Sequence, residues 1–259
     1  MAKPAVTAML RTYDQTLRAV HKAFKGADER GNHMSGMPSI LMVVTSHSRI
    51  DKGHPTGLWF EEFAVPYTLF REQGYGVTVA SPGGGDAPID PASLEGYEPT
   101  PENEAARAAL KETRRVDASL QADDFAALFF PGGHGTMFDL PDNPEIRRLV
   151  SAFAQADKVL ASVCHGPACL VGAMLSDGTP LVKGRRVTAF TDSEERAVEL
   201  DGLMPFLLET RLRELGAQFV PGVNWQDNVV VDGRLVTGQN PQSSASAARA
   251  VIGLLSEHG

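Results

Sequence analysis

Cys164 lies in the segment Ser162 to Pro167 (SVCHGP), at a position suited to nucleophilic chemistry. It follows an apolar run and precedes a glycine and a proline, so a buried strand should turn sharply there into a helix that Pro167 can begin. A thiol at that turn meets the positive end of the helix dipole, and we expect this to lower its pKa and favour the thiolate. The alternative is a small buried cysteine that only packs, as we expect of Cys169.

A glycine-rich segment, PGGHG at 131–135, ends the preceding apolar run. Its glycines allow backbone amides to approach a ligand closely. The amides of Gly133 and His134, together with the amide of His165, could form an oxyanion hole that binds the oxygen of an attacked carbonyl. The alternatives are a simple turn and a phosphate-binding loop, although neither the Walker lysine nor a GxGxxG spacing is present.

Two pairs of acidic residues could assist a cysteine nucleophile. Glu61 and Glu62 belong to an otherwise apolar helix (WFEEFAVPYTLF), so at least one carboxyl should lie near the apolar boundary, where its pKa would rise and suit proton transfer. Both could instead be solvated. His165 is the first candidate base, but adjacent side chains at a turn diverge, so its ring would have to swing to reach the sulfur. Glu194 and Glu195 could orient that ring, or could simply place charge at a helix N-terminus.

Short apolar runs alternate with helical segments from Ser39 onward. Their β-branched, continuous character indicates strands buried on both faces, and their alternation with helices predicts an α/β domain with a doubly wound, mostly parallel sheet. In such a sheet ligands bind beyond the carboxyl ends of the strands, where the candidate residues lie. The predicted strands are 40–44, 77–81, 125–131 and 158–164, the predicted helices are 58–73, 144–156 and 243–255, and the loops with a claim to function are 46–55, 132–135, 164–167 and 191–195.

Three other segments complete the predicted organisation. VVVDGRLV at 229–236 predicts a C-terminal β-hairpin whose turn uses positive φ angles at Asp232 and Gly233. The stretch 82–123, rich in proline and glycine, should be a surface insertion over one end of the sheet. Residues 1–36 should form a helical extension and linker ahead of the domain at 37–259. The extension could pack on the domain or on a second subunit, or could reflect a start codon placed upstream.

Composition narrows the classes of function. The 259 residues are 42% hydrophobic, enough for one large core, and the net charge of −8 disfavours nucleic-acid and anionic-membrane partners. A small or neutral ligand fits better. Two cysteines do not make a disulfide framework, and no cysteine and histidine cluster suggests zinc. Charged residues interrupt the apolar runs of the N-terminus, so we expect a cytoplasmic protein with no membrane span.

The motifs EEFAVPY, PGGHG, SVCHGP, VTAFTDSEE and LVTGQNPQSS occur in an order and spacing similar to those of the ThiJ/PfpI superfamily of class I glutamine amidotransferase-like proteins. The chain most resembles the branch of heat-shock-protein-31-type glyoxalase III enzymes and chaperones, from about Ile40 to the last helix. The resemblance implies a flavodoxin-like fold, a homodimer and a cysteine-dependent lyase. Such an enzyme converts 2-oxoaldehydes such as methylglyoxal into 2-hydroxy acids, as D-lactate dehydratases do, without a cofactor or a metal.

The resemblance also assigns roles. It implies that Cys164 is the nucleophile, that His165 is its neighbouring histidine and that Glu62 is the helix glutamate that hydrogen-bonds the sulfur. Glu195 matches the acidic triad member, with Glu194 as the fallback.

Our mechanistic hypothesis is that the Cys164 thiolate adds to the aldehyde while amides of Gly133 and His165 hold the oxyanion. Glu62 or His165 then moves a proton between the two substrate carbons, and water hydrolyses the resulting thioester.

Other functions stay open. One is a stress-response holdase, in which an apolar surface such as the helix at 4–25 would bind unfolded clients; a protein deglycase is another. A cysteine peptidase or amidase ranks last, because the 82–123 insertion would roof the site against a peptide. The histidine and glutamate pair of glutamine amidotransferases is missing, since His258 is the only histidine near the C-terminus.

Overall fold

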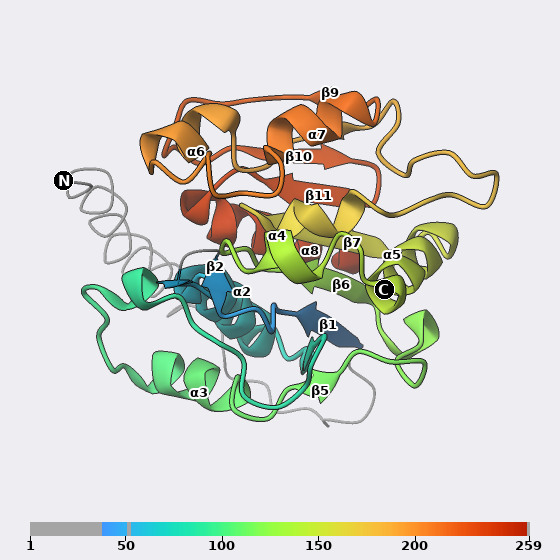
Figure 1. The fold of residues 1–259 in the computed structure, drawn as a ribbon. Coiled ribbons are helices and arrows are strands. Elements are labelled where there is room, and N and C mark those ends of the chain that lie inside the picture. The colour runs from blue at the N-terminus through green and yellow to red at the C-terminus, as the bar shows by residue number, and fades with distance from the viewer. Residues whose placement is uncertain (1–37, 51–52, 258–259) are drawn as a thin grey trace.

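A seven-stranded sheet forms the centre of the protein, whose computed structural model describes residues 38–50 and 53–257 (Figure 1). The strands are β1 (Ser39–Val43), β4 (Gly76–Ser81), β5 (Arg114–Arg115), β6 (Ala127–Phe130), β7 (Val159–Val163), β10 (Val229–Asp232) and β11 (Leu235–Gly238). Their order is β10-β11-β7-β6-β1-β4-β5, and all neighbours are parallel except β10 and β11. The predicted mostly parallel α/β sheet and its C-terminal hairpin are confirmed.

Helices cover both faces of this sheet. Side chains of α2 and α8 belong to the core on one face, and side chains of α5 and α7 belong to the core on the other. The α-helices are α2 (Phe60–Glu72), α3 (Pro101–Ala109), α4 (Thr136–Asp139), α5 (Pro144–Gln155), α6 (Asp192–Ala197), α7 (Leu208–Glu214) and α8 (Ser244–Ser256). The 3₁₀ turns are η2 (Pro91–Leu94), η3 (Ala122–Asp124), η4 (Gly166–Leu170) and η5 (Pro241–Ser243). Two small sheets have two strands each. One pairs β2 (Arg49–Ile50) with β3 (His54–Pro55), and the other pairs β8 (Arg186–Val187) with β9 (Gln218–Phe219).

The apolar run of β1 divides between the two cores. Leu41 and Val43 point to the core beneath α5, whereas Ile40 and Met42 point to the core beneath α2 and α8. All four side chains are fully buried. Side chains alternate along a strand, so a strand covered by helices on both faces must be apolar at every position, and this is why the run lacks a polar residue.

The loops that carry the candidate residues meet at one edge of the sheet. Strand β1 lies between β4, the next strand of this sheet along the chain, and β6, which follows later. Leu41 of β1 therefore pairs with Thr78 of β4 and with Leu128 of β6. Strand β7 follows next to β6. The carboxyl ends of β1, β6 and β7 therefore open together at the switch point of the sheet, where ligands of such folds bind.

The hairpin turn differs in detail from the sequence prediction. Asp232 still belongs to β10 and pairs with Leu235, so Gly233 and Arg234 form the turn. Gly233 has a φ of +60°, whereas Asp232 is not among the residues with positive φ. Asp232 stays extended because its backbone completes the ladder while its carboxylate accepts a hydrogen bond from the N–H of Arg186 at 2.7 Å.

The predicted extension at 1–36, including the helix at 4–25, lies outside the described residues. The insertion at 82–123 contains α3 and the edge strand β5. Within the described part of the chain, no helix combines the length and the apolar character needed to cross a membrane.

Gly166 provides a test of how tightly the turn after β7 is packed. A Cβ added there would lie 2.2 Å from the carbonyl oxygen of Phe130, at the end of β6. We expect Gly166→Ala to lower the free energy of unfolding by at least about 1–3 kcal/mol, the usual cost of overpacking. Gly253→Ala in α8, where an added Cβ meets nothing within 4 Å, is the control and should raise stability by up to about 1 kcal/mol. Urea denaturation checks both, and equal midpoints would contradict a tightly packed turn.

Candidate active site

The turn at Cys164 is a strained elbow. Its φ is +59°, a left-handed conformation that typically costs a residue other than glycine about 1–3 kcal/mol. Hydrogen bonds on both sides impose it, because the Cys164 N–H donates to Gly238 at 3.0 Å and the Cys164 carbonyl accepts from the N–H of Phe190 at 2.9 Å. The elbow places Sγ 3.3 Å from Nδ1 of His165. The expected divergence of these two side chains is therefore wrong, and the ring needs no swing to reach the sulfur.

The expected effect of the helix dipole on Cys164 is also wrong. The segment after the elbow, η4, is a five-residue 3₁₀ turn rather than a long helix. Burial raises the pKa of the Cys164 thiol well above its ordinary value, and a hydrogen bond from the Gly133 amide only partly opposes this. The resting sulfur is consequently a thiol, and a base within the site must remove its proton.

Glu195 contacts two imidazole rings. Its Oε2 lies 2.7 Å from Nε2 of His165, and its Oε1 lies 2.8 Å from Nε2 of His134. The two rings themselves are 4.2 Å apart between centroids. Sequence analysis placed His134 among the substrate-binding residues but did not connect it with Glu195.

Glu195 sets the tautomer of His165. Burial acts to raise the pKa of Glu195, but the two histidines outweigh it and hold that pKa well below its ordinary value, so the carboxylate is ionised. Burial lowers the pKa of His165, with His134 adding to this, so the ring of His165 is neutral. A carboxylate only accepts hydrogen bonds, so Nε2 of His165 carries the hydrogen and Nδ1 keeps a lone pair toward Cys164. The ring is thereby set to accept the thiol proton.

Glu194, the alternative to Glu195, lies among other partners. Its Oε2 and the Thr191 hydroxyl form a reciprocal capping box at the start of α6. Its Oε1 accepts hydrogen bonds from the N–H of Trp225 at 2.9 Å and from the side-chain amides of Gln239 and Asn240 at 3.1 and 2.9 Å. Glu194 therefore holds the loop near Trp225 in place and makes no hydrogen bond with either imidazole.

Glu62 lies beside Cys164 and is fully buried. Oε2 accepts a hydrogen bond from the N–H of Gly132 at 2.7 Å, whereas Oε1 has no hydrogen bond of good geometry within the described residues. Burial raises the pKa of Glu62 well above its ordinary value, so the carboxyl is protonated and can donate a hydrogen bond to the sulfur. Glu61 is buried too, and burial raises its pKa to about 8. The alternative of two solvated acids is wrong.

Gly133 brings its backbone close to the site. Its φ is +94°, and a Cβ there would lie 2.3 Å from the carbonyl oxygen of Gly57 and 2.5 Å from the nitrogen of Trp59. Only glycine fits that gap. Its amide points at the Cys164 sulfur, and no backbone carbonyl of the described residues accepts from the amides of Gly133, His134 or His165. These three amides therefore have no backbone acceptor within that part of the chain, and their role as an oxyanion hole stays a prediction.

Cys164 opens into a cavity of about 200 Å³ whose surface is mostly apolar. Trp59, Phe190 and Asp90 are among the lining residues that sequence reasoning missed. Trp59 and Phe190 supply aromatic walls, and the Phe190 ring lies 4.5 Å from the ring of His165. Asp90 is held by the Thr56 hydroxyl at 3.0 Å and by the N–H of Ala92 at 2.9 Å. The sequence could have indicated Phe190, because it ends an apolar run just before the loop at 191–195. It gives no comparable indication for Asp90, which only precedes a proline in a predicted turn.

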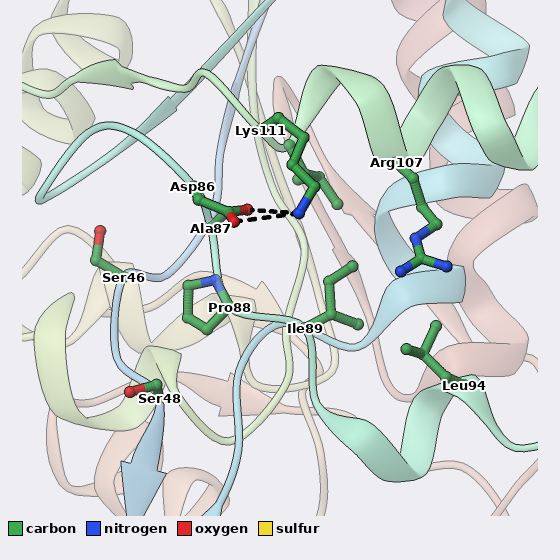
Figure 2. Close-up of a pocket in the computed structure, with 10 residues that line it drawn as sticks. Ser46, Ser48, Asp86, Ala87, Pro88, Ile89, Leu94, Arg107 and Lys111 are labelled. Carbon is green, nitrogen blue, oxygen red and sulfur yellow. Dashed lines mark hydrogen bonds and ion pairs between the residues drawn. The ribbon is translucent and has the colours of Figure 1, made fainter.

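A second pocket is lined in part by the segment 86–89 (Figure 2). It is open, its lining also includes Ser46, Arg107 and Lys111, and Lys111 Nζ pairs with Asp86 at 3.1 Å. It contains none of the candidate residues, whereas Glu62, Gly133, His134, Cys164 and His165 line the cavity at Cys164.

His134, His165 and Glu195 also offer three metal-ligand atoms that lie within 4.8 Å of one another. Their ring nitrogens already donate to the carboxylate, so a metal ion would have to displace both hydrogens. The observed distances of 2.7 and 2.8 Å are those of charge-assisted hydrogen bonds.

Comparisons with known proteins found similar sequences and a similar fold. The model of the DJ-1/PfpI family matches residues 59–253. Glutathione-independent glyoxalase hsp3101 of Schizosaccharomyces pombe is 34% identical over 85% of this chain and 96% of that protein. Glyoxalase 3 of Candida albicans is 31% identical over 83% of this chain and 98% of that protein. The crystal structure of glyoxalase III from Candida albicans superposes with a TM-score of 0.75 at 28% identity, covering 86% of this chain and 98% of that one.

Adjacent glutamates provide a matched test of the imidazole pair. In Glu195→Gln, the amide can accept from one ring but presents N–H to the other, so His165 loses its fixed tautomer. We expect alkylation of Cys164 at neutral pH, followed by mass spectrometry, to slow at least about tenfold, because a positioned base typically contributes 10²–10⁴. Glu194→Gln should keep the wild-type alkylation rate while losing about 1–3 kcal/mol of stability, since it disturbs buried hydrogen bonds. Equal alkylation rates in the two variants would contradict the assignment of Glu195.

Proposed function

This chain belongs to the DJ-1/PfpI family, as its motifs predicted, and we propose that it is a glutathione-independent glyoxalase that converts 2-oxoaldehydes such as methylglyoxal into 2-hydroxy acids. The observation that carries the proposal is the Cys164 sulfur, 3.3 Å from a neutral His165 ring that Glu195 orients, at the wall of a small cavity. A thiol beside an oriented base is the arrangement needed for nucleophilic addition to a carbonyl.

The reaction begins at the sulfur. Nδ1 of His165 takes the thiol proton while Sγ bonds to the aldehyde carbon, C1, and the π electrons of the carbonyl move to its oxygen. The amides of Gly133 and His165 bind that oxygen, and a proton returned from His165 completes the thiohemiacetal. Since burial opposes a lasting thiolate, proton removal and bond formation are expected to be coupled.

Isomerisation of the thiohemiacetal follows. A base removes the proton from C1, and the C–H electron pair becomes the C1–C2 double bond of an enediolate. The hydroxyl proton on the C1 oxygen passes to the oxygen on C2. Return of the first proton to C2 then gives a thioester at C1 and a hydroxyl at C2. Water then adds to C1, the C–S bond breaks and sulfur recovers its proton. Each cycle consumes one water and needs no redox partner.

The cavity favours small, uncharged substrates. Its volume of about 200 Å³ suits a molecule of a few heavy atoms, and its described lining contains the carboxyls of Glu62 and Asp90 but no lysine or arginine. Burial raises the pKa of Asp90, so further negative charge in this cavity is disfavoured. A neutral aldehyde should enter readily, and the carboxylate product should be expelled.

The other candidate functions have less support. A cavity of this size gives no room for a peptide, which weighs against a peptidase, an amidase or a deglycase acting on folded protein. The large hydrophobic side chains exposed within the described residues come from separate segments, namely Met174, Leu175, Val223 and Val231. The helix at 4–25 invoked for a holdase and its unfolded clients lies outside those residues. The homodimer and the cytoplasmic location stay predictions.

Incubation of the purified protein with methylglyoxal should yield lactate in the absence of glutathione. Cys164→Ser should abolish lactate formation, because a hydroxyl with a far higher pKa cannot replace the thiol. Cys169→Ser, which changes the other buried cysteine outside the cavity, is the matched control and should remain active. Lactate formation by Cys164→Ser at the wild-type rate would rule out the proposed chemistry.

A further inference from the structure

Nδ1 of His134 is a ring nitrogen at the cavity that has no hydrogen-bond partner among the described residues. His134 lines the cavity together with Cys164, and its Nε2 is occupied by Glu195. Its Nδ1 makes no hydrogen bond within the described residues, and its side chain keeps 11% exposure, unlike the sealed ring of His165 at 1%. The ionised carboxylate requires a hydrogen on Nε2, so in the neutral ring Nδ1 holds a lone pair that is open to the cavity.

The two residues that the sequence suggested for carbon-to-carbon proton transfer are poorly placed for it. His165 directs its Nδ1 at the sulfur and its Nε2 at Glu195, so its lone pair faces the sulfur and not the carbon-to-carbon bond of the substrate. Glu62 is protonated, because burial raises its pKa well above its ordinary value, and a neutral carboxylic acid cannot accept the proton. A third group with a free lone pair is therefore needed.

We propose that His134 is this group, a further catalytic residue that carries the proton from C1 to C2 of the bound oxoaldehyde through its Nδ1. This assignment rests on the proposed glyoxalase function. Nδ1 accepts the C1 proton as the C–H pair forms the enediolate double bond, and the resulting imidazolium returns that proton to C2. His134 ends each cycle neutral, so the step requires no co-reactant.

Glu195 can serve both histidines because they are charged at different times. Two imidazolium rings 4.2 Å apart would repel, and His134 already disfavours the charged form of His165. One carboxylate can compensate one positive charge. His165 is charged only while it holds the thiol proton, and His134 is charged only during the enediolate step, so the same carboxylate stabilises each ring in turn.

Other titratable groups line the same cavity. Asp90 is the nearest rival, because it lines the same cavity and its charge interacts with His134. Its Oδ1 and Oδ2 each accept a hydrogen bond, from Ala92 and Thr56 respectively, and hydrogen bonds to the ionised form make the carboxylate a weaker base. His54 also lines the cavity and is exposed, and Glu62 is buried with a raised pKa. Only His134 combines a free lone pair with a compensating carboxylate.

The test uses His134→Gln, whose amide can still donate to Oε1 of Glu195 and so preserves a structural role. We expect lactate formation to fall at least about 100-fold, the lower range for loss of a general base. Alkylation of Cys164 and its reversible protection by methylglyoxal should stay as in the wild type, because addition to the aldehyde uses His165. Methylglyoxal deuterated at C1 should show a larger isotope effect in the variant than in the wild type.

Two further variants complete the test. Added imidazole should partly restore lactate formation to His134→Ala, which a purely structural defect would not allow. His47→Gln, at a ring stacked on Phe138 outside the cavity, is the matched control and should keep full activity.

The outcomes separate the two proposals. If the wild type forms no lactate, the glyoxalase function itself fails. If the wild type is active and His134→Gln keeps its rate, the role of His134 is overturned. It is also overturned if His134→Gln loses Cys164 alkylation as well, which would indicate that His134 only positions His165. If Asp90→Asn loses the isomerisation step and His134→Gln keeps it, Asp90 is the group that carries the proton.

Discussion

The left-handed backbone at Cys164 is the constraint on which the site depends. The elbow joins β7, the end of β11 and the start of the 191–195 loop, because its amide and carbonyl are bound by Gly238 and Phe190. Without the positive φ, adjacent side chains would diverge and the thiol would not meet the ring of His165. A residue in this conformation persists only where surrounding structure imposes it, and here two hydrogen bonds within a packed sheet do so. The strained backbone at Cys164 thus allows the side chains of two adjacent residues, Cys164 and His165, to contact each other.

The site also depends on the hydrogen-bond partners and the ionisation of its buried carboxyl groups. Glu195 is ionised because two imidazoles donate to it, and Glu194 is buried among hydroxyl and amide donors. Glu62 lies beside the sulfur with one amide partner, and burial keeps it protonated. Burying an unpaired charge is costly, so each carboxyl takes the protonation state that its immediate partners can support. Acids of one residue type thereby supply a hydrogen-bond acceptor, a structural anchor and a proton donor.

Much of this arrangement could be predicted from the sequence. Apolar runs with no polar interruption indicated strands buried on both faces, and the glycine and proline that follow Cys164 indicated a sharp turn. The order of the motifs indicated the family and singled out Glu62 and Glu195 from their neighbours. Other features could not be predicted. The sharing of Glu195 by His134 and His165 joins residues 30 and 61 positions apart, and the short η4 turn removed the expected helix dipole. Asp90 reaches the cavity from a loop that no periodic pattern describes.

The sequence by itself determined the class of fold, the edge of the sheet where the candidate residues meet, and the residue types available for chemistry, because these follow from local periodicity, turn chemistry and chain order. Tertiary structure decided the geometry and the protonation states. It set which glutamate faces the imidazoles, why the cysteine rests as a thiol, and which ring nitrogen is left with a free lone pair. These properties depend on distances of a few ångströms between distant segments and on exclusion of water, and neither is encoded in any local stretch of the chain.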